Sequence, residues 1–400
     1  MSPETPRSKQ EKGLLVVQVA ALGYELARHI PGWDFRPLQT IFPALTCPVQ
    51  ASFRTALAPR EHGMEANGIY QPDLRRPFFW EQSSALVKGR RIWENFRAEG
   101  GTVAMICWQQ SLGEEADYII SPAPIHKHGG GMILECALKP QGLLKPDFPL
   151  HRYWGPLADD RSTQWIVEAT LKVIRDRQPG LVLTYLPTLD YQLQRKGRDP
   201  KGIRQIATHL DRLRKESGYR LVVFGDYAIT PAHRPIYINR VLRRMGLFKT
   251  RRVRGMLYPD FHNSRAFALV DHQVAHIFGE TGLVQKRFPE LVRDLSPDGN
   301  RLTLLAPDGE WFAYPWWTRK SEAPDYARHI DIHNKPGYDP TELFFFDRRA
   351  ESIRGTHGSE RPLAAVASDL PFHGKTLIDL AQTVKAHLDQ CAADLRRLPR

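Results

Sequence analysis

Short apolar runs alternate with amphipathic stretches through the first half of the chain, and this alternation limits the fold more than any other feature. The apolar runs cover residues 14–20, 102–107, 181–186 and 220–224, and the amphipathic stretches cover 86–98, 162–176 and 201–217. Strands that alternate with helices of this length pair in parallel and carry helices on both faces of the sheet. The sequence therefore predicts an α/β fold with a mostly parallel central sheet. In such sheets the chemistry gathers at the carboxyl ends of the strands.

Two regions interrupt the alternation. Residues 126–156 are rich in Gly and Pro and predict a long loop. Residues 258–320 combine strand-like pieces (266–270, 302–305 and 311–314) with a helical stretch near 281–294, and we interpret them as a small inserted α+β cap. The expected organisation is a disordered tail at 1–13, a core at 14–257 and 321–350, the cap at 258–320, and a C-terminal part at 351–400. In that last part a loop-like stretch (354–372) precedes an amphipathic helix (375–397).

The composition points to a basic protein with anionic ligands. The chain has 56 Lys and Arg against 44 Asp and Glu, a formal net charge of +12. The excess favours phosphate esters, although each basic cluster could equally be a solvated surface. Nucleic-acid binding is a minor alternative, because the excess of Arg shows no aromatic-interleaved groove pattern and no known binding motif. The 4 cysteines lack CxxC spacing, and the apolar run at 14–20 is too short for a signal peptide or a membrane span, so we expect a cytoplasmic protein.

The first candidate site residue is Thr46, in Phe42-Pro43-Ala44-Leu45-Thr46-Cys47-Pro48. Pro48 suits a first helical turn, and residues 49–57 can continue as a helix. A hydroxyl at the start of a helix lies among free backbone N–H groups, which form a phosphate pocket. From its position alone, however, Thr46 is better explained as a simple N-cap.

Further polar residues follow in an order that favours a site. Asn67 lies at a turn and carries an amide able to donate to a phosphate oxygen. Asp190 and Asp226 each come just after a buried strand, and His333 lies far downstream. Two carboxylates and an imidazole form a ligand set suited to zinc or manganese.

In these motifs the chain resembles the type I phosphodiesterase/nucleotide pyrophosphatase family of the alkaline phosphatase superfamily, over residues 14–347. Members carry a strand ending in Asp, then FP-x-x-T-x-PN with a nucleophilic Thr, HG-x-x-x-N, Asp-x-x-x-His, an Asp-His pair, and a late His before Gly-Tyr. The resemblance implies an alkaline-phosphatase-like fold. By motif position it assigns the nucleophile to Thr46, the phosphate-holding amide to Asn67, and metal ligands to Asp190, Asp226 and His333.

Three positions depart from the family pattern. Ala20 stands where the first strand would end in Asp, Gln194 stands where Asp-x-x-x-His would place its His, and Tyr227 follows Asp226 in place of His. Gln194 could still supply an amide oxygen to a metal, so we count it among the candidate ligands. The altered ligand shell leaves one or two divalent ions, zinc or else manganese, as the expected cofactor.

The resemblance implies a phosphoric ester hydrolase. A metal would activate Thr46, which attacks phosphorus and forms a phospho-threonine that water then hydrolyses. The substrate would be a small molecule with a phosphodiester, pyrophosphate or phosphomonoester. The alternative is a pseudoenzyme that binds a phosphorylated metabolite or partner without turnover. Arg54, Arg60 or Arg75 could replace some of the missing cationic charge.

A second polar cluster offers replacement ligands. Asp271, His272 and His276 lie in an otherwise apolar, strand-like stretch, and in an alternating strand His272 and His276 would share a face. The simpler interpretation is a cap strand whose histidines are hydrogen-bonded. His126 and His128, in the glycine-rich loop, are interpreted as a surface pair.

Overall fold

The computed structural model describes residues 13–127, 132–145, 148–149, 158–197, 199–328 and 353–397. Its centre is an eight-stranded sheet with the order β2-β21-β11-β1-β10-β5-β6-β9. The strands are β2 (Arg36–Leu38), β21 (Ala364–Ser368), β11 (Arg220–Gly225), β1 (Leu14–Val19), β10 (Leu181–Leu186), β5 (Val103–Ile106), β6 (Tyr118–Pro122) and β9 (Cys136–Lys139). The neighbours from β11 to β6 pair in parallel, whereas β21 and β9 run against them. The predicted α/β class is confirmed.

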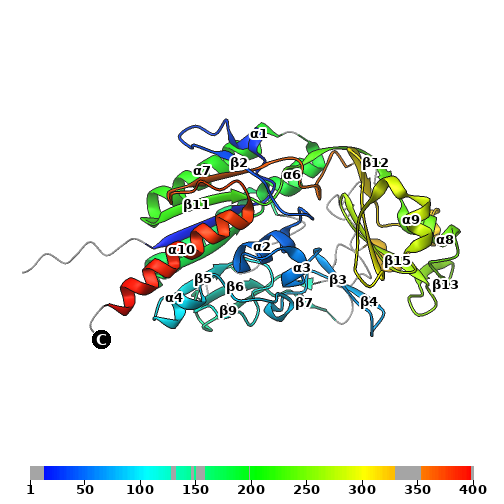
Figure 1. Ribbon diagram of the computed structural model, residues 1–400, viewed down its shortest axis with the longest axis horizontal. Coiled ribbons are helices and arrows are strands. Elements are labelled where there is room, and N and C mark those ends of the chain that lie inside the picture. Colours follow the sequence, from blue (N-terminus) through cyan, green and yellow to red (C-terminus); the bar gives the residue numbers. More distant parts are fainter. Residues whose placement is uncertain are drawn as a thin grey trace, which may run out of the picture.

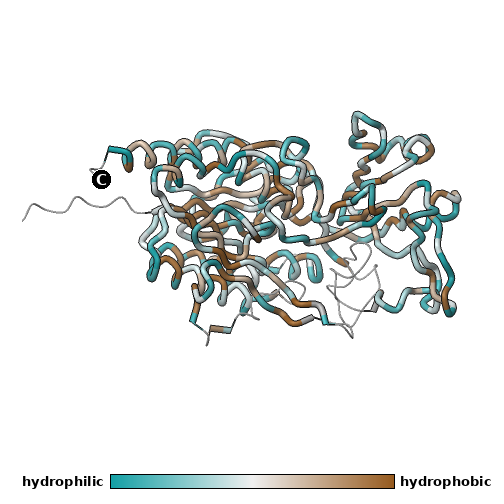
Figure 2. Tube along the Cα trace, turned by 90° about the horizontal axis from the view of Figure 1, so that it is seen from below, coloured by the Kyte–Doolittle hydropathy of each residue, from teal (hydrophilic) through white to brown (hydrophobic). Residues whose placement is uncertain are grey.

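Helices cover both faces of this sheet (Figure 1). Strand β1 divides its side chains between two cores, because alternate residues of a strand point to opposite faces. Leu15, Val17 and Val19 pack with residues of α5 (Asp160–Arg177) and α7 (Pro200–Ser217). Leu14 and Val16 pack with α2 (Thr46–Thr55), α4 (Glu94–Ala98) and α10 (Leu377–Arg396). Figure 2 shows that apolar residues concentrate in the strands at the centre of this part of the molecule and that more hydrophilic residues lie along the surrounding helices and loops.

The rest of the core consists of short elements around these layers. The short helices are α1 (Tyr24–Ala27), α3 (Pro59–His62) and α6 (Thr188–Lys196). Two hairpins join β3 (Gly68–Gln71) to β4 (Arg76–Phe79), and β7 (Ile125–His126) to β8 (Met132–Ile133). No helix in the described part of the chain is both long and apolar enough to cross a membrane.

A second body of elements lies beside the sheet, on the right of Figure 1. Its main sheet is antiparallel and has the order β15-β16-β18-β17. The strands of this sheet are β15 (Ala266–Asp271), β16 (Val274–Gly279), β18 (Arg301–Leu305) and β17 (Val292–Leu295). Around it lie α8 (Ile238–Arg244), the β13 (Thr250–Val253) and β14 (Met256–Pro259) hairpin, and α9 (Gly282–Arg287). The strands β19 (Gly309–Phe312), β12 (Thr230–Ile236) and β20 (Gly355–Thr356) form a further small sheet.

Several sequence predictions of local structure were wrong. The helix expected at 86–98 forms only at Glu94–Ala98. Gly89 takes a positive φ, Lys88 before it donates to the carbonyl of His62 in α3, and Ile92 after it donates to the carbonyl of Arg54 near the end of α2. The helix expected at 281–294 stops at Arg287, two residues before Pro289, and is followed by β17. The regions expected to be loops supply β9 and β21, which run antiparallel in the central sheet.

Candidate active site

The carboxyl ends of neighbouring strands bring the candidate residues together. Val19 of β1 is level with Leu186 of β10 on one side and with Gly225 of β11 on the other. Asp190 therefore follows one neighbour of β1 and Asp226 follows the other, as the parallel arrangement predicts.

Thr46 is the first residue of α2, and the N-cap position belongs to Leu45, which makes no side-chain cap. The Thr46 side chain is nearly buried, and its hydroxyl lies 3.3 Å from the hydroxyl of Tyr227. It also contacts the hydroxyl of Tyr185, a residue that the sequence analysis missed. Thr46 therefore uses its hydroxyl within a buried polar cluster rather than to cap its own helix.

Asn67 lies beside the start of α2, with its amide held at both ends. Its Oδ1 accepts the backbone N–H of Cys47 (3.0 Å), and its Nδ2 donates to Oδ1 of Asp271 (3.2 Å). An amide nitrogen carries two hydrogens. The second one has no hydrogen-bond partner among the described residues.

Asp190 lies in the first turn of α6 and accepts a hydrogen bond from Nε2 of Gln194 (2.8 Å). It also interacts with the Tyr227 hydroxyl. Burial raises the pKa of the Asp190 carboxyl to about 6, although both hydrogen bonds oppose the rise. Oε1 of Gln194 has no hydrogen-bond partner among the described residues.

His357 completes this part of the site. Its Nε2 lies 3.9 Å from Oδ1 of Asp190, and its ring stacks on Tyr227 at 3.7 Å. Nδ1 donates to the carbonyl of Ala44 (3.0 Å), and burial lowers the pKa of the imidazole to about 3. The ring is therefore neutral and turns the lone pair of Nε2 toward Asp190. The predicted late imidazole ligand was His333, which lies outside the described residues. The sequence signal for His357 is a His directly before Gly358.

Asp226 is used differently from Asp190. One carboxylate oxygen accepts the backbone N–H groups of Ala21 (2.8 Å) and Tyr227 (3.0 Å), and the other accepts Nε2 of Gln18 (3.0 Å). Burial raises the pKa of Asp226 to about 8; the bond from Ala21 opposes this rise, and the charge of Asp190 adds to it. Ala20, beside it, offers no ligand atom.

The cluster at 271–276 is a hairpin rather than one strand, so the prediction that His272 and His276 share a face of a continuous strand was wrong. Asp271 ends β15, His272 takes a positive φ in the turn, and His276 lies in β16. Nδ1 of His276 pairs with the Thr303 hydroxyl (3.1 Å) inside the cap. Asp271 faces Asn67 instead of a metal.

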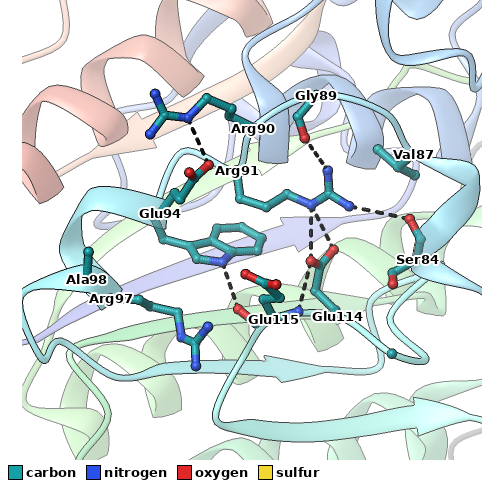
Figure 3. Close-up of a pocket in the computed structure, with 12 residues that line it drawn as sticks. Ser84, Val87, Gly89, Arg90, Arg91, Glu94, Arg97, Ala98, Glu114 and Glu115 are labelled. Carbon is teal, nitrogen blue, oxygen red and sulfur yellow. Dashed lines mark hydrogen bonds and ion pairs between the residues drawn. The ribbon is translucent and has the colours of Figure 1, made fainter.

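None of the three arginines named as replacement charges is free to serve Thr46. Arg60 pairs with Asp294, and Arg75 donates to the carbonyl of His262. Arg54, at the far end of α2, is fully buried and pairs with Glu114 (3.2 Å). Arg91 donates to Glu114 as well, and both residues line the pocket shown in Figure 3. This ion cluster fixes α2 in place and does not reach the site.

The described residues fit one divalent ion better than two. No three His, Cys, Asp or Glu side chains come together around a metal position within them. Asp190, Nε2 of His357 and the unpartnered Oε1 of Gln194 form a mixed ligand set for one ion. A second ion would have fewer ligands, because the Ala20 side chain offers no ligand atom, Asp226 already accepts three N–H donors, and the Tyr227 hydroxyl interacts with Thr46 and Asp190.

Solved structures show the same fold at low sequence identity. Phosphonoacetate hydrolase from Sinorhizobium meliloti 1021, in complex with phosphonoformate, is similar with a TM-score of 0.59 and 14% identity, over 95% of this chain and 96% of that one. Human ectonucleotide pyrophosphatase/phosphodiesterase 5 is similar with a TM-score of 0.57 and 13% identity, over 94% and 95%. The murine form of that protein, in an inactive variant in complex with AMP, gives 0.54 and 14%, over 95% of each chain.

Comparison with curated protein sequences gave no match. The model of the family of phosphoric ester hydrolases described as type I phosphodiesterase / nucleotide pyrophosphatase matches residues 31–339. This match covers most of the chain, including Thr46, Asn67, Asp190 and Asp226. The chain therefore belongs to the type I phosphodiesterase/nucleotide pyrophosphatase family.

Proposed function

We propose that this chain hydrolyses a phosphoric ester of a small molecule, with Thr46 as the nucleophile and at most one divalent ion. The observation that carries the proposal is the meeting of Thr46, Asn67, Asp190 and His357 at one edge of the sheet, around Tyr227. Nucleophile, amide donor and ion ligands are the parts that a covalent phosphoryl-transfer site needs.

In this proposal Asn67 holds the phosphoryl group. The second hydrogen of its Nδ2 donates to a non-bridging oxygen, while Cys47 and Asp271 keep the amide from turning over. The free backbone N–H at the start of α2 adds positive potential at the same place. The phosphorus atom is thereby presented to the Thr46 hydroxyl.

Tyr227 and Asp190 take the proton of the nucleophile. Because burial raises the pKa of Tyr227 well above 10, the phenol stays protonated, donates to Asp190 and accepts from Thr46. As Thr46 Oγ1 bonds to phosphorus, the ester P–O bond breaks and the leaving group departs as its oxyanion, while the Thr46 proton moves to Tyr227 and the Tyr227 proton moves to Asp190. In the second step the oxygen of water bonds to phosphorus, the bond from Thr46 Oγ1 to phosphorus breaks, and Asp190 returns the proton to Thr46 through Tyr227. The phosphate product leaves with the oxygen of that water, and the water protons go to the product and the solvent. A divalent ion held by Asp190, Gln194 and His357 would stabilise charge on the phosphoryl oxygens and lower the pKa of that water; zinc or manganese suits these ligands.

Turnover of an aryl phosphodiester, such as bis(p-nitrophenyl) phosphate, tests the proposal. Thr46→Ala should lower turnover by roughly a thousandfold or more, because the covalent step is lost. Its melting temperature should stay close to that of the wild type, since Thr46 caps no helix. Retained turnover in Thr46→Ala, measured on protein free of contaminating phosphatases, would remove Thr46 from the mechanism.

A second candidate is a family member that binds a phosphorylated molecule without turnover. The replacement of a family ligand by Tyr227, whose hydroxyl lies 3.3 Å from that of Thr46, favours it. The two candidates differ in one result. The binding protein would bind inorganic phosphate but hydrolyse nothing, whether zinc or manganese is added. The hydrolase would bind inorganic phosphate and also hydrolyse the aryl phosphodiester.

A further inference from the structure

The turn between β15 and β16 is buried, although all its residues are polar. Asp271 is 0% exposed, His272 3% and Gln273 1%. Hairpin turns normally lie on the surface, and burying polar groups is costly unless they are hydrogen-bonded. This turn, which we call the cap tip (residues 271–273), therefore needs hydrogen-bond partners; the carbonyls of His272 and Gln273 accept the N–H groups of Phe312 and Ala306, and other partners lie outside residues 258–320.

Asp271 makes the first set of these contacts, and both belong to Asn67. Its Oδ2 accepts the backbone N–H of Asn67 (3.0 Å), and its Oδ1 accepts the side-chain Nδ2 (3.2 Å). The carboxylate thus holds backbone and side chain of the same residue. Only a group with two acceptor oxygens can do this without turning a donor toward one of the two N–H groups.

The other two residues of the cap tip contact the segment that carries His357. The ring of His272 packs on the ring of His357 at 4.0 Å. The backbone N–H of Gln273 donates to the carbonyl of His357 (2.9 Å), and Oε1 of Gln273 accepts the N–H of Ser359 (3.3 Å). One turn of the cap therefore contacts both Asn67 and the segment around His357.

We propose that Asp271 is a positioning residue: it orients the Asn67 amide for the phosphoryl group, and through it the cap tip completes the site. The role of Asn67 toward phosphate rests on the proposed function, whereas the orientation of its amide by Asp271 does not. If the amide turned over, Oδ1 instead of Nδ2 would face the phosphoryl oxygens and repel them. Without Asp271, only the hydrogen bond from Cys47 opposes that rotation; Asp271 adds a second bond to the amide and also holds the backbone N–H of Asn67.

The test uses Asp271→Asn, which keeps the shape and removes one acceptor, with His276→Gln as control. His276 is a buried polar residue of the same hairpin whose Nδ1 bonds to Thr303. Calorimetry with inorganic phosphate should show affinity falling about tenfold or more in Asp271→Asn, the usual effect of losing a hydrogen bond to a charged group. In His276→Gln, affinity should stay within twofold while the melting temperature falls.

A double-variant cycle separates positioning from general stability. If Asp271 acts through Asn67, adding Asp271→Asn to Asn67→Ala should cause no further loss of phosphate affinity or turnover. Additive losses, or wild-type affinity and turnover in Asp271→Asn, would overturn the proposal. Should Asp271→Asn not fold, Asp271→Ser keeps a smaller acceptor in its place and enters the same cycle.

A crystal structure of the Asp271 variant distinguishes failure of this inference from failure of the proposed function. A reoriented Asn67 amide supports the positioning role even if the wild type neither binds phosphate nor turns over, a result that would reject only the proposed function. An unmoved Asn67 amide would reject the positioning role.

Discussion

The site around Tyr227 has two halves, one around Asp190 and one around Asp226, and the two carboxyl groups have different hydrogen-bond partners. Asp190 accepts from two side chains, and the neutral imidazole of His357 turns an unshared lone pair toward it. Asp226 accepts from the backbone of Ala21 and Tyr227 and from the side chain of Gln18. The first carboxylate is still available to a ligand, whereas the second has become part of the scaffold.

The difference shows that a residue can match the family motif without keeping the surroundings that a metal ligand needs. With Ala20 and Tyr227 as neighbours, Asp226 lacks the companion ligands of the family motif, and N–H donors occupy its oxygens instead. Asp190 retains His357 as a companion. We therefore expect the halves to respond differently to substitution, with changes around Asp190 affecting ligands and changes around Asp226 affecting stability.

The largest expected effect is a loss of stability at α2, the helix that begins with Thr46. Glu114→Ala would leave the guanidinium of Arg54 buried without a counter-charge and should destabilise the fold by roughly 3–5 kcal/mol. Exposed Glu115 is the matched control, and its replacement by Ala should change the free energy of unfolding by less than about 0.5 kcal/mol. Denaturant unfolding measures both, and an equal response would show that the cluster in Figure 3 does not anchor α2.

Asp190→Asn and Asp226→Asn compare the halves directly. Asp190→Asn should weaken zinc binding by roughly a hundredfold and lower turnover, because it removes a charged ligand. Asp226→Asn should leave zinc affinity within a few-fold of the wild type. Calorimetric zinc titrations give both affinities, and a greater loss in Asp226→Asn would reverse the comparison.

Much of this contrast could not be predicted from the sequence. The alternation of strands and helices predicted the central sheet, and the motifs located Thr46, Asn67, Asp190 and Asp226, because these depend on local pattern and order along the chain. The antiparallel strands β9 and β21 were missed, since strands of four and five residues are too short to show a clear period. His357 and Asp271 reach the site only through tertiary packing, so neighbours in sequence could not reveal their partners.

Acid conditions offer a way to separate the fold around α2 from the site. His62 is buried, accepts the N–H of Met64 at Nδ1, and donates from Nε2 to Ser52 of α2. Burial, aided by the charge of Arg54, lowers its pKa to about 4, below its usual value near 6.5. The unfolded chain therefore takes up the proton first, so the stability contributed above pH 6.5 is lost as the pH falls toward 4.

Between pH 7 and pH 5 this loss should be about 2 kcal/mol for His62 alone. His62→Gln, which does not titrate, should show a correspondingly flatter dependence of unfolding free energy on pH. Parallel curves for the variant and the wild type would show that His62 is not the group responsible.

The smallest expected effect is the stability cost of Asp226→Asn. The amide nitrogen would replace one of the acceptor oxygens, so about one hydrogen bond is lost, at a cost of about 1 kcal/mol in unfolding free energy. Thermal unfolding without added metal measures it. No change in stability would mean that Asp226 is not part of the scaffold.

The metal content of the purified protein tests the central claim most directly. After saturation with zinc and removal of the free ion, elemental analysis should find no more than one ion per chain. His357→Ala should lose that ion, and Asp226→Asn should keep it. Two ions per chain, or loss of the ion in Asp226→Asn but not in His357→Ala, would contradict the account of the two halves.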